Sequence, residues 1–199
     1  MATLDFWFEL ASTYSYLAVS RIGPIAADAR VEVRWRPFAL GPIFAAAGWN
    51  SSPFELYPAK GRYMWRDVAR EAERLGLPLR RPSVFPRNTI LAARVAVLGV
   101  ERPWGRRFVR DVMTANFADD RDIASPAVLD EVLAGLDLDG PAIREEAESP
   151  ARKAALRAAT TEAIELGIFG APTFMVGGEM FWGNDRLERA LEWAQASRG

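Results

Sequence analysis

The segment with the clearest chemical potential is Ser12-Thr13-Tyr14-Ser15, which follows a bulky apolar run near the N-terminus. If a helix begins there, its first turn offers free N–H groups and the positive end of the helix dipole to an anion. Serine is also a preferred helix N-cap, so Ser12 could simply cap its helix. The residues alone leave both interpretations open.

Two further polar segments lie near the C-terminus. Gly170-Ala171-Pro172-Thr173 precedes an expected strand. A cis proline there would leave the main chain of Ala171 free to pair with an extended ligand, whereas a trans proline would make an ordinary turn. In Gly183-Asn184-Asp185-Arg186, the aspartate and Glu188 have capping-box spacing. The functional alternative is that the Asn184 and Asp185 region binds the amino and carboxylate groups of an amino-acid ligand.

The composition excludes several kinds of chemistry. The chain has no cysteine and no histidine, which excludes a thiolate nucleophile, a CxxC redox pair, a Ser-His-Asp triad and an imidazole zinc site. We therefore expect no metal, and any soft nucleophile must come from a ligand. With 25 basic and 26 acidic side chains, the net charge of −1 gives no general attraction to nucleic acid or to a membrane surface.

No targeting or membrane segment is expected. The first residues, MATLDFWFELAS, lack a basic region and contain two acids. The most apolar stretch, residues 90–100, is too short to span a bilayer and is interrupted by Arg94. We therefore expect a cytoplasmic protein.

The elements that must position these segments follow a β-α-β, helices, α-β-β-α order. Alternating bulky residues predict strands at 3–8 and 31–36, joined by a crossover helix from Ser12, which makes the strands parallel. Between residues 39 and 150 the pattern predicts only helices, roughly at 40–47, 60–75, 88–99, 103–116, 126–134 and 141–147, with Ser125 and Ser149 as N-caps. A helix at 152–166, strands at 173–176 and 179–182 with a Gly177-Gly178 turn, and a final helix complete the chain.

This order and the three polar segments resemble the thioredoxin fold with a helical insertion, the DsbA-like arrangement. The Ser-x-Tyr-Ser segment and the stretches YPAKGRYMWRD (57–67) and FWGNDRL (181–187) are similar to 2-hydroxychromene-2-carboxylate isomerases, relatives of kappa-class glutathione transferases. The resemblance covers essentially the whole chain. It implies an α/β fold in which a thioredoxin-like domain (1–38 and 151–199) is interrupted by an all-helical insertion domain (39–150).

The family pattern implies glutathione as the cofactor. Ser12 matches the serine whose hydroxyl contacts the glutathione sulfur, and Ala171, before Pro172, matches the residue whose backbone pairs with the cysteinyl part. Asn184 and Asp185 match positions that bind the γ-glutamyl end, and the resemblance assigns two insertion contacts to glutathione, Asn50 and Lys60. In redox members, cysteines would occupy positions 12 and 15, so that activity is excluded here. Thr13 stands where the family commonly has proline, which we expect to affect loop geometry slightly.

The implied function is a glutathione-dependent cis-trans isomerase of aromatic hydrocarbon (naphthalene-type) degradation. It would interconvert 2-hydroxychromene-2-carboxylate and trans-o-hydroxybenzylidenepyruvate by reversible addition of the glutathione thiolate. The thiol pKa is about 8.5 when free, and a helix N-terminus plus the Ser12 hydroxyl could bring it near neutrality. The alternatives are a kappa-like transferase or peroxidase and a non-catalytic glutathione-binding protein.

The small aromatic carboxylate substrate needs a flat apolar slot and a polar partner for its carboxylate. For each candidate, core packing or a solvated position is the competing interpretation. Aromatic residues around Trp104 and Trp193 are a weak indication of a homodimer. The slot candidates are Trp65, Phe85 and Trp182 among the aromatic residues and Arg62, Arg66, Arg87 and Asn88 among the polar ones.

Overall fold

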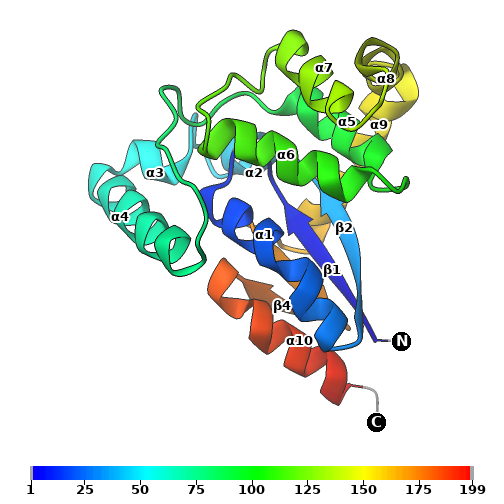
Figure 1. Cartoon of the computed structure of the whole chain (residues 1–199). Helices are drawn as coiled ribbons and strands as arrows, with labels where there is room; N and C mark the ends of the chain where they lie inside the picture. The colour runs from blue at the N-terminus through cyan, green and yellow to red at the C-terminus, as the bar shows by residue number, and fades with distance from the viewer. Residues whose placement is uncertain (1, 198–199) are drawn as a thin grey trace.

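A computed structural model describes residues 2–197, and within them a four-stranded sheet has the order β2-β1-β3-β4. Strand β1 (Ala2–Phe8) pairs in parallel with β2 (Val31–Pro37), and helix α1 (Thr13–Asp28) connects the two. Strand β3 (Thr173–Val176) runs antiparallel to β1 and forms a hairpin with β4 (Glu179–Trp182). Figure 1 shows this central sheet, with the N-terminal and C-terminal segments side by side.

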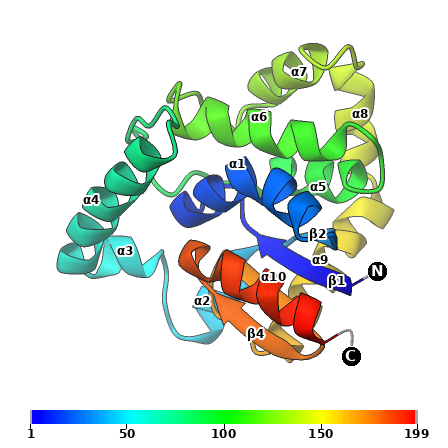
Figure 2. The same cartoon turned by 60° about the horizontal axis from the view of Figure 1, so that its bottom comes forward.

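The alternation along β1 gives the sheet two buried faces. Phe6 stacks on Phe8 with ring centroids 5.2 Å apart and on Phe174 at 5.4 Å, on the face covered by α1 and α10 (Leu187–Ala196). Trp7 points to the opposite face and shares a second cluster with Ala163 of α9 (Pro150–Glu165). Figure 2 shows α1 and α10 on the near side of the sheet and α9 behind it. The rigid sheet thus holds the ends of β1 and β3 in a fixed relation.

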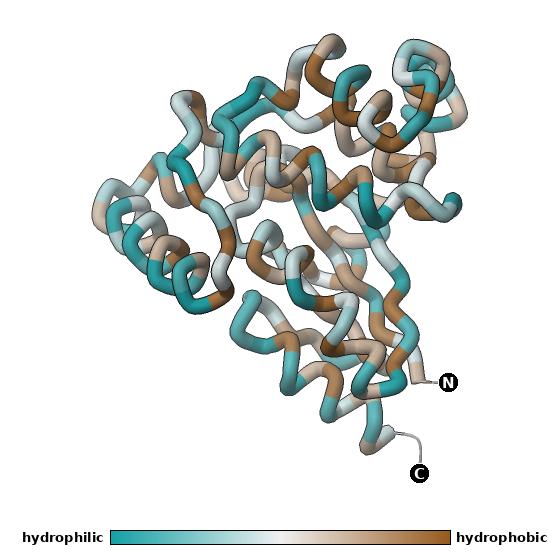
Figure 3. Tube along the Cα trace, viewed as in Figure 1, coloured by the Kyte–Doolittle hydropathy of each residue, from teal (hydrophilic) through white to brown (hydrophobic). Residues whose placement is uncertain are grey.

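The segment between β2 and α9 is helical. Helices α5 to α8 share the main core, whereas α4 packs against α1 through a smaller cluster of Leu17, Met64, Val68 and Ala72. Figure 3 shows hydrophobic residues recurring among hydrophilic ones along α4, as expected for a helix with one buried face. The elements are α2 (Leu40–Ala46), α3 (Pro53–Leu56), α4 (Pro58–Arg74), α5 (Ile90–Gly99), α6 (Gly105–Phe117), α7 (Pro126–Ala134) and α8 (Gly140–Ala147).

The structure confirms the predicted fold class and most elements, with helix ends shifted by a few residues. Helix α3 was not predicted, because four residues capped by Ser52 are too short to show helical periodicity. Ser149 caps α9 as predicted, but Ser125 makes no side-chain capping bond in the described chain. The division at residues 39 and 150 stays a prediction, since the main core contains residues from both parts. Within residues 2–197, no helix combines the length and apolar content needed to cross a membrane.

Candidate functional site

A cleft of about 1610 Å³ lies where the start of α1, the loops before β3 and after β4, and the helices α2 to α4 meet. Its wall includes six of the residues that the sequence assigned to glutathione: Ser12, Asn50, Lys60, Ala171, Asn184 and Asp185. The seventh, Pro172, is buried and does not line the cleft. Residues predicted from separate segments therefore share one cavity.

Ser12 lies in the turn between β1 and α1 and joins two of the predicted segments. Its Oγ accepts a hydrogen bond from the Ser15 N–H at 3.2 Å, which makes it the N-cap of α1. The same hydroxyl donates to the Ala171 carbonyl oxygen at 2.9 Å. Capping and contact with the proline loop are therefore compatible. Thr13 begins α1 where proline is common in the family, and its hydroxyl lies 3.2 Å from the sulfur of Met64.

The loop before β3 has the cis form that the sequence left open, at the Ala171–Pro172 bond. Thr173 Oγ1 donates to the Gly170 carbonyl at 2.9 Å, and the Gly183 N–H donates to the Pro172 carbonyl at 3.0 Å. The first bond closes the proline loop on itself, and the second ties the loop to the segment after β4. A second cis bond, Phe85–Pro86, was not predicted.

The segment after β4 is a 3₁₀ turn, η1 (Asn184–Arg186), and not the predicted capping box. Gly183 occupies its N-cap with φ +112°, and the Asp185 carboxylate folds back to within 2.6 Å of where a Cβ on Gly183 would lie. The positive φ makes any other residue at position 183 strained, and a side chain there would also displace the Asp185 carboxylate. Asp185 is exposed, with its side chain 71% accessible, so its carboxylate faces the cleft without capping α10.

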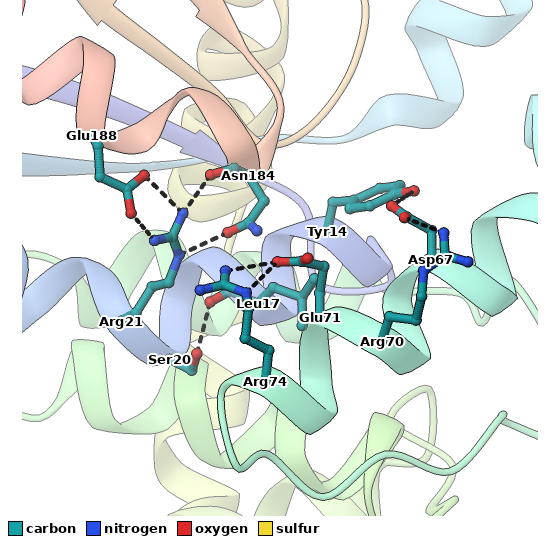
Figure 4. A network of polar contacts seen from close by, with 10 residues as sticks. All are labelled: Tyr14, Leu17, Ser20, Arg21, Asp67, Arg70, Glu71, Arg74, Asn184 and Glu188. Carbon is teal, nitrogen blue, oxygen red and sulfur yellow. Dashed lines mark hydrogen bonds and ion pairs between the residues drawn. The ribbon is translucent and has the colours of Figure 1, made fainter.

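Arg21 of α1 fixes the η1 turn through side-chain hydrogen bonds. Its guanidinium is buried in α1 and donates to the Asn184 carbonyl at 2.6 Å, to Asn184 Oδ1 at 3.0 Å and to Glu188 at 3.1 Å. Figure 4 shows Arg21 between these two residues, next to the Tyr14–Asp67 and Glu71–Arg74 contacts of α1 and α4. The sequence reasoning missed Arg21, because an arginine inside a helix carries no local sign that it is buried.

The insertion supplies the facing wall. Lys60 and Asn50 are both exposed in the cleft, and the Lys60 ammonium lies 5.0 Å from the centre of the Tyr57 ring. Tyr14 donates to Asp67 at 2.9 Å across the cleft floor. Burial and the neighbouring Asp67 carboxylate raise the pKa of Tyr14, so its hydroxyl stays a neutral donor.

The predicted substrate slot is only partly assembled. Phe85, Asn88 and Trp182 line the cleft, and Trp182 meets Phe169 edge to face with centroids 4.8 Å apart. Trp65 is not on the cleft wall, because it packs against Phe85 at 4.9 Å and under Arg81. Arg62 and Arg66 are likewise absent from the wall.

Arg87 reaches the wall, but its guanidinium is already engaged. It is buried and donates to Asn116 at 2.8 Å and to the Asp120 carboxylate at 2.6 Å. Hydrogen bonds from Ser83 and Arg87 lower the pKa of Asp120 to about 2, so this carboxylate stays charged at neutral pH. The pair joins the 85–90 segment to the end of α6, and Asp120 balances the charge that was expected to attract a substrate carboxylate.

Glu9 is a buried acid on the same wall that the sequence reasoning did not select. Its carboxylate accepts the Ala11 N–H at 2.8 Å and the Thr89 hydroxyl. Burial raises the pKa of Glu9 from 4.5 to about 7, against the lowering effect of these hydrogen bonds. The sequence offered one signal for Glu9: it is an acid within the apolar run FWFELA, where the end of a strand is expected to be buried.

The profile of the DsbA-like thioredoxin domain matches residues 3–193, so the chain belongs to the DsbA-like thioredoxin family. A 2-hydroxychromene-2-carboxylate isomerase from Sphingobium xenophagum is 30% identical over 187 residues, which are 94% of each chain. A solved structure of 2-hydroxychromene-2-carboxylate isomerase matches with a TM-score of 0.86 at 28% identity, covering 98% of this chain and 95% of the other. Glutathione S-transferase kappa 1 of Caenorhabditis elegans is 26% identical, covering 96% of this chain and 90% of that protein. Within the DsbA-like family, the chain is a member of the 2-hydroxychromene-2-carboxylate isomerase family, and the kappa transferases are more distant relatives.

Proposed function

We propose that the protein is a glutathione-dependent isomerase that interconverts 2-hydroxychromene-2-carboxylate and trans-o-hydroxybenzylidenepyruvate. The observation that carries this proposal is the contact between Ser12, at the start of α1, and Ala171 of the proline loop, inside a cleft of a chain that has no cysteine or histidine. When bound, glutathione supplies the nucleophilic sulfur that adds reversibly to the conjugated double bond and so permits its rotation.

The cleft wall has the groups that glutathione needs. Ser12 donates to the sulfur, the main chain of Ala171 pairs with the cysteinyl unit, and Asp185 receives the γ-glutamyl ammonium beside Asn184. For the ligand carboxylates the wall offers Asn50 and Lys60. Of the described cations on this wall, each arginine is ion-paired with an acid, whereas no acid lies within ion-pair distance of Lys60. The Lys60 ammonium is therefore available to a ligand.

The first prediction separates the isomerase from a kappa-like transferase, the second candidate, which the kappa relative favours. With the chromene substrate and substoichiometric glutathione, an isomerase brings all of the substrate to the isomerisation equilibrium, which changes the ultraviolet spectrum without net loss of thiol. A transferase consumes thiol in proportion to product, and a binding protein changes neither signal. S-methylglutathione, which lacks the free thiol, is the matched control and supports no turnover.

The second prediction concerns Arg21. Arg21→Met removes the side-chain donor to the buried Asn184 Oδ1 and leaves the Asn184 carbonyl with the Leu187 N–H, so we expect the η1 turn to loosen and the KM for glutathione to rise about tenfold with kcat little changed. Steady-state kinetics with varied glutathione measure this. Arg21→Lys restores part of the affinity, and Arg107→Met, at an exposed position of α6, is the matched control. An unchanged KM in Arg21→Met would remove Arg21 as a positioning residue.

A further inference from the structure

Glu9 and Ser12 belong to one tight turn. Strand β1 ends at Phe8 and α1 begins at Thr13, and the Ser12 N–H donates to the Glu9 carbonyl at 3.1 Å within that turn. Glu9 is only 7% exposed as a residue, yet it lines the cleft. Its carboxylate accepts the N–H of Ala11, the neighbour of Ser12, at 2.8 Å and the Thr89 hydroxyl, so it lies in the same turn as the residue proposed to contact the ligand sulfur, on the side of the 85–90 segment.

The fold does not explain why this position is acidic. Thr89, the residue before α5, and the N–H of Ala11 donate to the carboxylate, but among the described residues no cation forms an ion pair with it. The pKa of Glu9 is set by burial and hydrogen bonds, with no charged side chain among its causes. The cation of the segment packed against it, Arg87, is paired with Asp120, and that of α1, Arg21, is paired with Glu188. A buried carboxylate without a cation costs stability, and such costs are concentrated at functional sites.

We propose that Glu9 is the proton carrier of the site, taking the proton of the bound thiol and returning it when the product leaves. In this step the S–H bond breaks, its electron pair stays on sulfur, and an O–H bond forms on the Glu9 carboxylate, directly or through one water. The reverse transfer regenerates both groups, so an isomerisation needs no external acid or base. The inference rests on the proposed glutathione dependence.

The electrostatics favour a shared charge. A carboxylate and a thiolate in one cleft repel each other, so the two groups titrate as a pair that carries one negative charge over a wide pH range. Transfer of the proton from sulfur to Glu9 leaves the charge of the site unchanged. Burial brings the pKa of Glu9 to about 7. Near neutral pH, proton transfer between the thiol and the Glu9 carboxylate is therefore nearly balanced in free energy.

The direct test counts protons. Calorimetry of glutathione binding at pH 8, repeated in buffers of different ionisation enthalpy, measures protons released to solvent. The wild type is expected to release close to none, because the proton moves to Glu9. Glu9→Gln, which is nearly isosteric, is expected to release most of one proton. Glu32→Gln, at an exposed acid on β2 outside the cleft, is expected to behave as the wild type.

Turnover provides the second measurement. Glu9→Gln is expected to lower kcat/KM at pH 7 about 100-fold. Thr89→Val removes a donor to the charged carboxylate and should move the acid limb of the pH profile to higher pH. Equal proton counts and equal pH profiles in the wild type and Glu9→Gln would overturn the role of Glu9. If the wild type itself showed no glutathione-dependent isomerisation, the proposed function would be contradicted instead.

Discussion

Ser12→Ala is expected to lower glutathione-dependent turnover by about 100–1000-fold, the usual loss when one preorganised donor to a developing anion is removed. In the structure the Ser12 hydroxyl donates to the Ala171 carbonyl, so donation to a ligand sulfur requires rotation about the Cβ–Oγ bond, which moves the hydrogen and keeps the capping bond from Ser15. A hydrogen bond to a charged group contributes about 1.5–3 kcal/mol, so the pKa of the bound thiol should rise by about one to two units. Loss of the N-cap of α1 should also cost about 1 kcal/mol of stability.

The thiolate has its own ultraviolet absorbance, so a pH titration of bound glutathione measures that change separately from turnover. Ser20→Ala is the matched control: Ser20 lies on the same helix, outside the cleft, and its hydroxyl donates to the Leu17 carbonyl of that helix. The control should keep both the thiol pKa and the turnover of the wild type. If Ser12→Ala also kept both, Ser12 would be a helix cap and nothing more.

The sheet and most helices could be predicted because local patterns encode them. The alternation in β1 and β2 marks the residues that face the main core, and the Gly177-Gly178 turn closes the β3–β4 hairpin. The meeting of Ser12 with Ala171, 159 residues away, followed from the order of elements in a known fold and not from the residues of either segment. Site geometry was thus predictable where it depends on topology.

Side-chain environments could not be predicted, because distant residues create them. Asp120 neutralises Arg87 from a loop 33 residues further on, and nothing local to Arg87 indicates that partner. Trp65 likewise has a partner distant in sequence, because it packs against Phe85 and not on the cleft wall. Burial in the folded chain raises the pKa of Glu9, and the hydroxyl of Thr89, the residue before α5, opposes that rise. The chemistry of the cleft therefore depends on how the insertion helices pack.

That packing requires a glycine at the contact of α5 with α6. A Cβ on Gly105 would lie 1.8 Å from the carbonyl oxygen of Gly99, and backbone on both sides leaves nothing flexible to move. Gly105→Ala must therefore separate the two helices, and we expect a loss of about 3 kcal/mol in the free energy of unfolding. For a chain of this length that corresponds to a fall of roughly 6–12 °C in Tm.

Urea and thermal unfolding measure this loss, with Gly23→Ala as the control. Gly23 lies in α1 with nothing within 4 Å of an added Cβ, so alanine there should stabilise the helix by about 0.5–1 kcal/mol. Because Thr89 directly precedes α5, a shift of that helix also displaces the donor to Glu9. Gly105→Ala should therefore lose turnover below its own Tm, with the acid limb of its pH profile moved upward as in Thr89→Val. A variant as stable as the wild type would show that α5 and α6 can separate without cost, and the placement of Thr89 would then not depend on their contact.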